Sequence, residues 1–203
     1  MDTATASHAF LFADLVGYTA LTAAHGDERA ADVATRFHTE VRRLLPAGAG
    51  PAEVKTLGDG LMIRLTDPVD AVRLGVAITE AVDDLTDVPA VRVGIHTGPA
   101  VHRDGDWYGT TVNVASRLCD AAADGEVLVS EDTAAAAGRP VGIAFGAPEL
   151  HTLKNLDAPI PARPAQLAAP APSPPRARAA LARLRERLRP ISCPAGHRMQ
   201  GAH

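Results

Sequence analysis

The chain has 203 residues, of which 46% are hydrophobic and 22% are charged, and its formal net charge is −4. These values suit one globular domain with an appendage and give no overall attraction to nucleic acid. No apolar run approaches the ~20 residues of a membrane span, and the N-terminus lacks the basic start and apolar core of a signal peptide. Cys119 and Cys193 match no metal or disulfide spacing. We therefore expect a cytoplasmic protein without a structural disulfide.

The first part of the chain alternates between strand and helix patterns. Residues 9–15 (AFLFADL) are a short apolar run that predicts a buried strand carrying Asp14 at its end. From Asp27 the apolar residues recur every three or four positions, which predicts a helix ending near Pro46 and Gly48. Residues 53–65 then form two apolar runs around Gly58-Asp59-Gly60, a strong hairpin signal that needs no functional explanation by itself.

The pattern continues with a second helix from Asp67, whose first turn contains Pro68, where a missing amide proton costs nothing. Residues 90–98 and 99–109 predict two strands, and residues 110–122 predict a third helix. Further strands are expected at residues 126–130 and near Val141 and Leu150. The order β-α-β-β-α-β-β-α predicts mixed α/β layers with the helices on one face of the sheet, and not a doubly wound parallel sheet.

The composition changes beyond about Pro161 to a mixture of Pro and Ala that is typical of a linker. We expect a domain over residues 1–166, a linker over 167–175, and an arginine-rich helix with a disordered end over 176–203. In that last segment one helical face collects three leucines amid arginines: Leu181, Leu184 and Leu188. The helix could contact an acidic partner or a membrane surface, but packing on its own domain or on a dimer mate is favoured.

Two acids stand where predicted strands stop. Asp14 and Asp59 form the kind of carboxylate pair that a hard divalent cation needs when phosphate oxygens complete its coordination shell. On the third helix, Asn113 and Arg117 are four residues apart and share one face, which suits a clamp for phosphate and ribose. Each pair alone is weak evidence, because an acid at a strand end is more often a turn residue and an exposed helix face is the favoured explanation of the second pair by itself.

The segment from Asp104 to Tyr108 contains a third candidate. Asp104-Gly105-Asp106 could begin a calcium loop, but no acid closes that loop at the required distance. A turn at Asp104-Gly105 is the better interpretation. It leaves Asp106 as an acid beside Trp107 and Tyr108, with no local explanation.

Four segments together resemble the class III nucleotidyl cyclase catalytic domain. They occur in the family's order: FADLVGYT (12–19), KTLGDG (55–60), VGIHTG (93–98) and DWYGTTVNVASRL (106–118). The resemblance covers roughly residues 8–166. It implies an α/β (α+β) fold with a ferredoxin-like βαββαβ core related to the polymerase palm. It also implies a two-fold homodimer with the active sites in the interface.

The resemblance also assigns roles to residues. Asp14 and Asp59 match the two metal aspartates, which hold two Mg²⁺ or Mn²⁺ ions. Asn113 and Arg117 match the residues that orient the ribose and stabilise the transition state. In the family the metal aspartates come from one subunit and the other site residues from its partner, so a monomer is expected to be inactive.

Lys55 and Asp106 match the pair that reads the purine. An ammonium and a carboxylate suit the N1 acceptor and N6 donor of adenine, whereas guanine presents the reverse pattern, so ATP is the expected substrate and cyclic AMP the product. Lys154 is the candidate for the family's phosphate-binding lysine, although Asn155 replaces the glycine expected after it. His96 also lies in a matching segment and is interpreted as structural.

Two other functions stay open at this point. A guanylate cyclase is disfavoured by the Lys55–Asp106 pair. A cyclase-like regulatory module would bind nucleotide or a partner without turnover, but such modules usually lose one or more metal or transition-state residues. This chain keeps all six of the matched residues, which favours catalysis.

Overall fold

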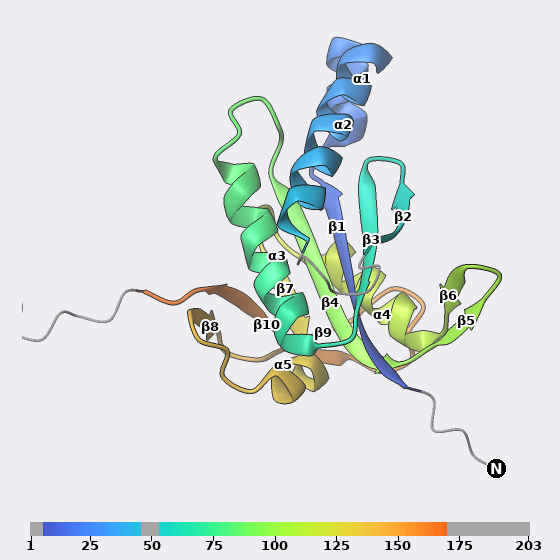
Figure 1. Cartoon of the computed structure of the whole chain (residues 1–203), viewed down its shortest axis with the longest axis vertical. Helices are drawn as coiled ribbons and strands as arrows, with labels where there is room; N and C mark the ends of the chain where they lie inside the picture. Colours follow the sequence, from blue (N-terminus) through green and yellow to red (C-terminus); the bar gives the residue numbers. More distant parts are fainter. Residues whose placement is uncertain (1–5, 46–52, 170–203) are drawn as a thin grey trace, which may run out of the picture. The chain divides into compact units, whose positions relative to one another are not determined.

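The computed structural model of the chain describes residues 6–45 and 53–169 (Figure 1). The chain divides into two units, Met1–Ala168 and Ala169–His203, and the fold described here is that of the first. The predicted helix stop at Pro46 and Gly48, the predicted arginine-rich helix and residues 170–175 of the predicted linker lie outside the described residues.

The described part of the first unit contains ten strands and five helices. The strands are β1 (Ser7–Leu15), β2 (Glu53–Leu57), β3 (Gly60–Leu65), β4 (Val91–Pro99), β5 (Val101–Arg103), β6 (Asp106–Tyr108), β7 (Val127–Ser130), β8 (Ile143–Phe145), β9 (Glu149–His151) and β10 (Ile160–Leu167). The helices are α1 (Tyr18–His25), α2 (Asp27–Leu44), α3 (Pro68–Asp83), α4 (Thr110–Ala121) and α5 (Glu131–Ala137).

Eight of these strands form one mixed sheet with the order β2-β3-β1-β4-β7-β10-β8, and β9 pairs with β10. β1 lies antiparallel to both β3 and β4, whereas β4 and β7 are parallel. β5 and β6 form a separate two-stranded sheet. The expected mixed α/β arrangement is therefore confirmed, and Asp14 ends up on a central strand.

Helices cover both faces of the sheet, so the expectation that they share one face is wrong. A side chain at Gly94 of β4 would collide with the backbone of α4, because its Cβ would lie 2.1 Å from the Cys119 nitrogen. On α3, a Cβ at Gly75 would meet the side chains of Val93 and Ile95, the residues on either side of Gly94. Neighbouring residues of a strand point to opposite faces, so α3 and α4 lie on opposite sides of β4 (Figure 1).

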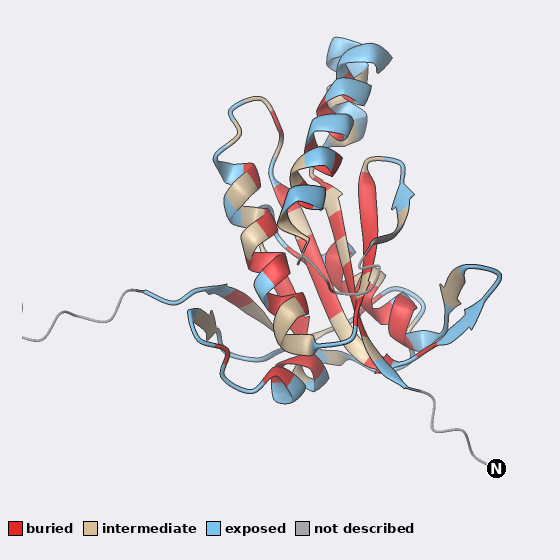
Figure 2. Cartoon of the chain, viewed as in Figure 1, coloured by how far each residue is buried: buried red, intermediate tan, exposed pale blue. Residues whose placement is uncertain are grey.

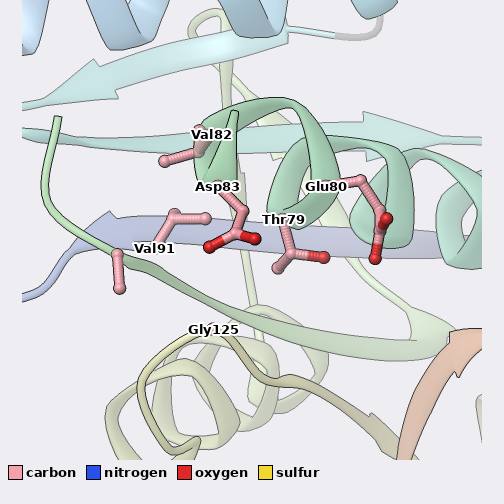
Figure 3. Close-up of a pocket in the computed structure, with 7 residues that line it drawn as sticks. Thr79, Glu80, Val82, Asp83, Val91 and Gly125 are labelled. Atoms are coloured by element: carbon pink, nitrogen blue, oxygen red, sulfur yellow. The ribbon is translucent and has the colours of Figure 1, made fainter. Parts of the chain in front are cut away.

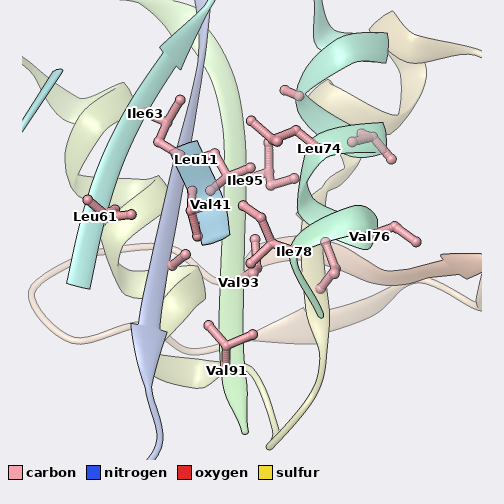
Figure 4. Packing of buried hydrophobic residues seen from close by; sticks show 14 of the residues in the cluster. Leu11, Val41, Leu61, Ile63, Leu74, Val76, Ile78, Val91, Val93 and Ile95 are labelled. Atoms are coloured by element: carbon pink, nitrogen blue, oxygen red, sulfur yellow. The ribbon is translucent and has the colours of Figure 1, made fainter. Parts of the chain in front are cut away.

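The main core lies on the α3 face. Leu11, Ile63, Val93 and Ile95 of the sheet are buried there against α2 and α3 (Figure 4). Phe37 of α2 belongs to the same core and is wholly buried. The α4 face holds two smaller buried clusters, one around Leu118 and one around Phe10. Burial is continuous along the central strands, whereas the outer side of α2 is exposed (Figure 2).

Local signals explain several element boundaries. Asp67 caps α3 by accepting a 2.8 Å hydrogen bond from the amide of Val69, and Pro68 opens the helix as expected. Asp104 and Gly105 have φ of 54° and 78°, so the turn predicted there is confirmed. That turn splits the single strand expected over residues 99–109 into the hairpin β5–β6, because two successive positive φ values reverse the chain.

Two helices were not expected from the sequence, and one segment expected to be a linker is a strand. α1 and α5 were not predicted, because α1 buries no residue and α5 is a short run dominated by alanine. The Pro/Ala mixture beyond Pro161 was interpreted as a linker, but Ile160–Leu167 is strand β10 between β7 and β8. The small side chains of Ala162 and Ala165 are buried there, so the mixture does contribute to the core.

Candidate active site

Asp14 lies near the end of β1 and points to the α4 face. Its neighbours Ala13 and Leu15 are buried in the α3-face core, and alternation along the strand directs Asp14 the other way. In the antiparallel register Ala13 faces Leu61, which brings the start of β3 beside Asp14. A Cβ on Gly60 would lie 3.0 Å from Asp14 Oδ1, so only glycine fits here comfortably.

Asp59 occupies the β2–β3 turn directly before that glycine. Burial raises the pKa of Asp59, and the neighbouring Asp14 carboxylate raises it further. The structure thus brings together the two acids that were predicted as metal ligands. Their mutual repulsion is what a divalent cation would relieve, and carboxylate oxygens are the donors that Mg²⁺ and Mn²⁺ prefer.

A metal here would take only part of its coordination from this chain. Within residues 6–45 and 53–169, no group of three or more His, Cys, Asp or Glu side chains could hold a metal ion. Two carboxylates fit a cation whose remaining ligands are phosphate oxygens and water. The residues present therefore fit metals that arrive with a nucleotide.

Arg92 is a contact of this site that was not predicted. It lies opposite Asp14 across the β1–β4 pair, and its guanidinium donates a 2.9 Å hydrogen bond to Asp14 Oδ2. That bond raises the pKa of Arg92. The signal that could have found it is the pairing of β1 with β4, which places an acid and a base directly across from each other.

Lys55 and Asp106 come together from two separate hairpins. Lys55 Nζ donates a 2.7 Å hydrogen bond to Asp106 Oδ2, and the pair is partly exposed. The bond from Lys55 is the main reason that the pKa of Asp106 is lowered. The predicted base-reading pair is thus assembled within one chain, with its other donor and acceptor sites open to a ligand.

Asn113 and Arg117 lie on α4, as predicted, with Asn113 exposed and Arg117 half-buried. Glycine at position 94 lets the helix carrying them lie directly on β4. Arg117 donates a 2.6 Å hydrogen bond to Asp120, an exposed acid that was not singled out from the sequence. An exposed pair of this kind contributes little to stability, so Arg117 can exchange Asp120 for a phosphate at low cost.

A cavity of about 150 Å³ adjoins Asp14. It lies between the end of β1, the start of β3 and α4, which contributes Ser116 and Asp120 to its lining. Ligand sites usually enclose about 300–1,000 Å³, so this cavity is too small to enclose a nucleoside triphosphate.

A larger cavity, about 220 Å³, has a different character (Figure 3). It lies where α3 ends and β4 begins, and the charged residues of its lining are Glu80 and Asp83. Two acids without a base among the lining residues disfavour a phosphate ligand. None of the predicted site residues lines this cavity.

Lys154 is exposed in the turn between β9 and β10. Asn155, which follows it, has φ of 62°. Asparagine tolerates this left-handed conformation better than most residues, so it can replace the glycine expected there. The departure from the family pattern thus leaves the turn intact.

His96 has a local partner, as expected for a structural residue. Its Nδ1 lies 2.8 Å from the Ser130 hydroxyl, and Ser130 caps α5 by accepting a bond from the amide of Thr133. Burial lowers the pKa of His96. Cys119 is also buried, which raises the pKa of its thiol to about 12 and makes it unreactive.

Comparison with known proteins decides the family. Residues 3–147 match the family described as the adenylate and guanylate cyclase catalytic domain. The chain belongs to this class III cyclase family. The cyclase segments that the match includes carry Asp14, Lys55, Asp59, Asp106, Asn113 and Arg117.

Relatives of this cyclase domain include bacterial adenylate cyclases. A pH-sensitive adenylate cyclase of Mycobacterium tuberculosis is 38% identical over 128 residues, which are 63% of this chain and 32% of that protein. An adenylate cyclase of Streptomyces griseus is 41% identical over 119 residues, 58% of this chain and 29% of the relative. The chain thus spans about a third of the length of these relatives.

Solved cyclase structures share the fold. The adenylyl cyclase CyaB from P. aeruginosa aligns with a TM-score of 0.68 at 22% identity, covering 81% of this chain and 95% of that one. The guanylyl cyclase Cya2 aligns with a TM-score of 0.68 at 18% identity, covering 81% and 94%. Because adenylyl and guanylyl cyclases both match, the fold alone does not select the base.

One expectation about the membrane can be compared with the fold. Among the residues that the structure describes, no helix is long and apolar enough to span a bilayer.

Proposed function

We propose that this cyclase domain converts ATP to 3′,5′-cyclic AMP and pyrophosphate, at active sites shared between the two subunits of a homodimer. The observation that carries the choice of ATP is the 2.7 Å pair of Lys55 and Asp106. Lysine still has two donors and the carboxylate still has free lone pairs, so together they match N1 and N6 of adenine. A guanine would place donors against the lysine and its carbonyl against the carboxylate.

The reaction joins the ribose 3′ oxygen to the α-phosphorus, in line with the departing pyrophosphate. Asp14 and Asp59 would hold the divalent cations, which supply charge neutralisation at the phosphates and acidify the ribose hydroxyl when bound. Asn113 orients the ribose. Arg117 leaves Asp120 to donate to the phosphate oxygens as charge develops in the transition state.

The shared site rests on two features of the single chain. The cavity beside Asp14, about 150 Å³, is too small for ATP. Lys55 also pairs with Asp106 while Asp59, four residues later, adjoins Asp14. A second copy would complete each site with its own base-reading pair and its own Arg117. Lys154 is proposed to bind the phosphates from its exposed turn.

The test is incubation of the purified protein with ATP or GTP and Mg²⁺ or Mn²⁺, following cyclic nucleotide and pyrophosphate. We expect cyclic AMP from ATP and about 10⁴-fold less product from GTP, since polar groups that a bound base covers and leaves unpaired reject the wrong base strongly. Lys55→Glu should abolish this preference. A variant that keeps the preference would refute the assignment of the base-reading pair.

The second candidate function is a nucleotide-binding regulatory module. The Asp14→Asn variant distinguishes this module from the cyclase. If the protein is an enzyme, the variant stops forming cyclic AMP but still dimerises. A dimeric wild-type protein that binds ATP without forming any cyclic product would identify the module instead.

A further inference from the structure

The single tryptophan of the chain stands at the centre of a ring cluster on the α4 face. Around the Trp107 indole, the ring centroids of His8, His102 and Phe10 lie at 4.6, 4.8 and 5.7 Å. The Arg64 guanidinium lies 5.2 Å from the indole centroid, within the range of a cation–π contact. No role proposed above for the catalytic residues uses this cluster.

Trp107 is also the immediate neighbour of the base-reading acid. Its backbone N–H donates a 2.8 Å hydrogen bond to Asp106 Oδ1, while Lys55 holds Oδ2 at 2.7 Å. The Trp107 N–H and the Lys55 ammonium therefore orient the two oxygens of Asp106, and the carboxylate keeps its orientation only if both groups stay in place. The position of the Trp107 backbone decides where the carboxylate points.

The hairpin that carries both residues is separate from the main sheet. β5 and β6 pair with each other and with no strand of the main sheet. Val101 and Tyr108, which face each other across the hairpin, are each 53% exposed. An isolated two-stranded hairpin is marginally stable in water, so side-chain contacts have to hold it in place. Trp107 supplies them, because it packs against the buried cluster around Phe10.

Arg64 connects this hairpin to the one that carries Lys55. Arg64 belongs to β3, which pairs with β2 so that Lys55 lies opposite Met62. Its guanidinium also contacts His8 Nδ1 at 3.3 Å, which ties it to β1. The contact between Arg64 and Trp107 therefore joins the hairpin that carries Lys55 to the hairpin that carries Asp106.

We propose that Trp107 is a positioning residue for purine selection. Its indole, held against Arg64, His8 and Phe10, locks the β5–β6 hairpin to the β2–β3 hairpin. It thereby sets the separation of Lys55 and Asp106 that reads adenine. This inference rests on the proposed function, since it concerns how the same site chooses its base.

The first test compares Trp107→Leu with Trp107→Phe. Leucine removes the edge-to-face ring contacts and the cation–π contact, whereas phenylalanine keeps an aromatic ring in the same place. We expect the ratio of kcat/KM for ATP over GTP to fall about tenfold or more in the leucine variant, and to stay near wild type in the phenylalanine variant. An unchanged ratio in Trp107→Leu, or an equal loss of both activities, would overturn the proposal.

Arg64→Gln provides a second variant that leaves the hairpin side chains intact. We expect the same fall in the ATP:GTP ratio, with a smaller change in the turnover of ATP. The matched control is Arg36→Gln on α2, where the arginine instead pairs with Asp87 at the far face. A ratio that falls equally in both variants would mean that any lost arginine suffices, and it would overturn the role of Arg64.

Because Trp107 is the sole tryptophan, its fluorescence reports on the cluster directly. Arg64→Gln should shift the emission of the free protein to longer wavelength as the indole becomes more exposed. A non-cyclisable ATP analogue with Mg²⁺ should change the emission of the wild type more than the GTP analogue does. If Arg64→Gln leaves the emission unchanged, the proposed contact between Arg64 and Trp107 is contradicted. This result counts even if the wild-type protein makes no cyclic product.

The two proposals fail in different ways. A wild-type protein without any preference between ATP and GTP refutes the adenine-specific function. A wild-type protein that prefers ATP, together with a Trp107→Leu variant that keeps the preference, refutes the positioning role alone.

Discussion

The two faces of the sheet in this cyclase domain differ: one holds most of the hydrophobic core, and the other carries predicted site residues. The α3 face buries a large continuous core between the strands and helices α2, α3 and α5, and it contains none of the predicted site residues. The α4 face has two smaller clusters, and Asp14 and α4 with its Asn113 and Arg117 belong to that side. The α4 face also gathers charged side chains at its surface, including the pair of Asp14 and Arg92.

The difference follows from strand alternation. β1, β3 and β4 present apolar residues to the α3 face in an unbroken run, so that face can supply most of the hydrophobic stabilisation. The alternate positions on the same strands are free to carry His8, Asp14, Arg64 and Arg92. One set of strands therefore supports a stable core on one side and carries predicted site residues on the other. Changes on the α3 face should alter stability alone, and changes on the α4 face should alter catalysis.

The largest expected effect is that of Asp14→Asn on the α4 face. Loss of a metal carboxylate should lower turnover by at least about a hundredfold, while the fold persists because Asp14 is only partly buried. Asp87→Asn is the matched control, since Asp87 also pairs with arginine, Arg29 and Arg36, but on the α3 side of the molecule. Product formation and circular dichroism of both variants check this prediction, and reduced turnover in Asp87→Asn would break the division between the faces.

Phe37→Ala tests the opposite face. Phe37 is wholly buried in the α3-face core, and its truncation should lower the free energy of unfolding by about 3–5 kcal/mol. Below the unfolding transition the ATP:GTP ratio should match wild type. Phe10→Ala on the α4 face should cost similar stability and also change that ratio, because Phe10 contacts Trp107. Urea denaturation with parallel assays separates the two outcomes, and equal ratios in both variants would contradict the account.

Two glycines allow a matched comparison of helix packing. In Gly94→Ala the new Cβ would lie 2.1 Å from the Cys119 nitrogen and 2.5 Å from the Ala115 oxygen, so α4 has to move. We expect a loss of about 1–3 kcal/mol in stability, together with lower turnover as Arg117 is displaced. In Gly75→Ala the obstacles are side-chain atoms of Ile95 and Val127, and alanine favours the helix.

Gly75→Ala should therefore leave both properties close to wild type. Thermal unfolding and kcat for the two variants would be measured side by side. If Gly94→Ala retained full turnover, close packing of α4 on β4 would not be required for catalysis.

A smaller effect is expected from pH. Burial lowers the pKa of His96 below 6.5, while Asp132 partly opposes the shift. Below pH 6.5 the unfolded chain binds a proton that the folded His96 does not, so this contribution to stability is complete above pH 6.5 and declines as the pH falls toward the lower folded pKa. His96→Gln should flatten the slope of unfolding free energy below pH 6.5 in urea titrations. His8, whose pKa is also lowered by burial, keeps part of the slope.

Much of this arrangement was predictable from short-range patterns. The strand ending at Asp14, the Gly58-Asp59-Gly60 hairpin and the helix with Asn113 and Arg117 all follow local periodicity and turn chemistry. The order of four segments then identified the family, which its match over residues 3–147 confirms. The individual roles of the site residues stay predictions.

The remaining features could not be predicted because they depend on pairing between segments that are far apart in the sequence. Arg92 became visible only through the β1–β4 register, and the cluster at Trp107 only through the approach of two hairpins. Strand β10 was missed because proline and alanine carry no strand signal of their own, and its neighbours β7 and β8 impose the extended conformation. The helices on the second face were missed because the expectation rested on the order of the elements, and that order does not fix the face on which each helix packs.

The measurement that tests the central claim most directly is complementation between two inactive variants. Asp14→Asn and Arg117→Ala, carrying different affinity tags, would be co-expressed, and the mixed dimer would be assayed with ATP. If each site takes its metal aspartates from one subunit and its arginine from the other, the mixed dimer has one intact site. A randomly paired mixture should then regain about a quarter of wild-type activity. A purified mixed dimer that forms no cyclic AMP would contradict the shared site.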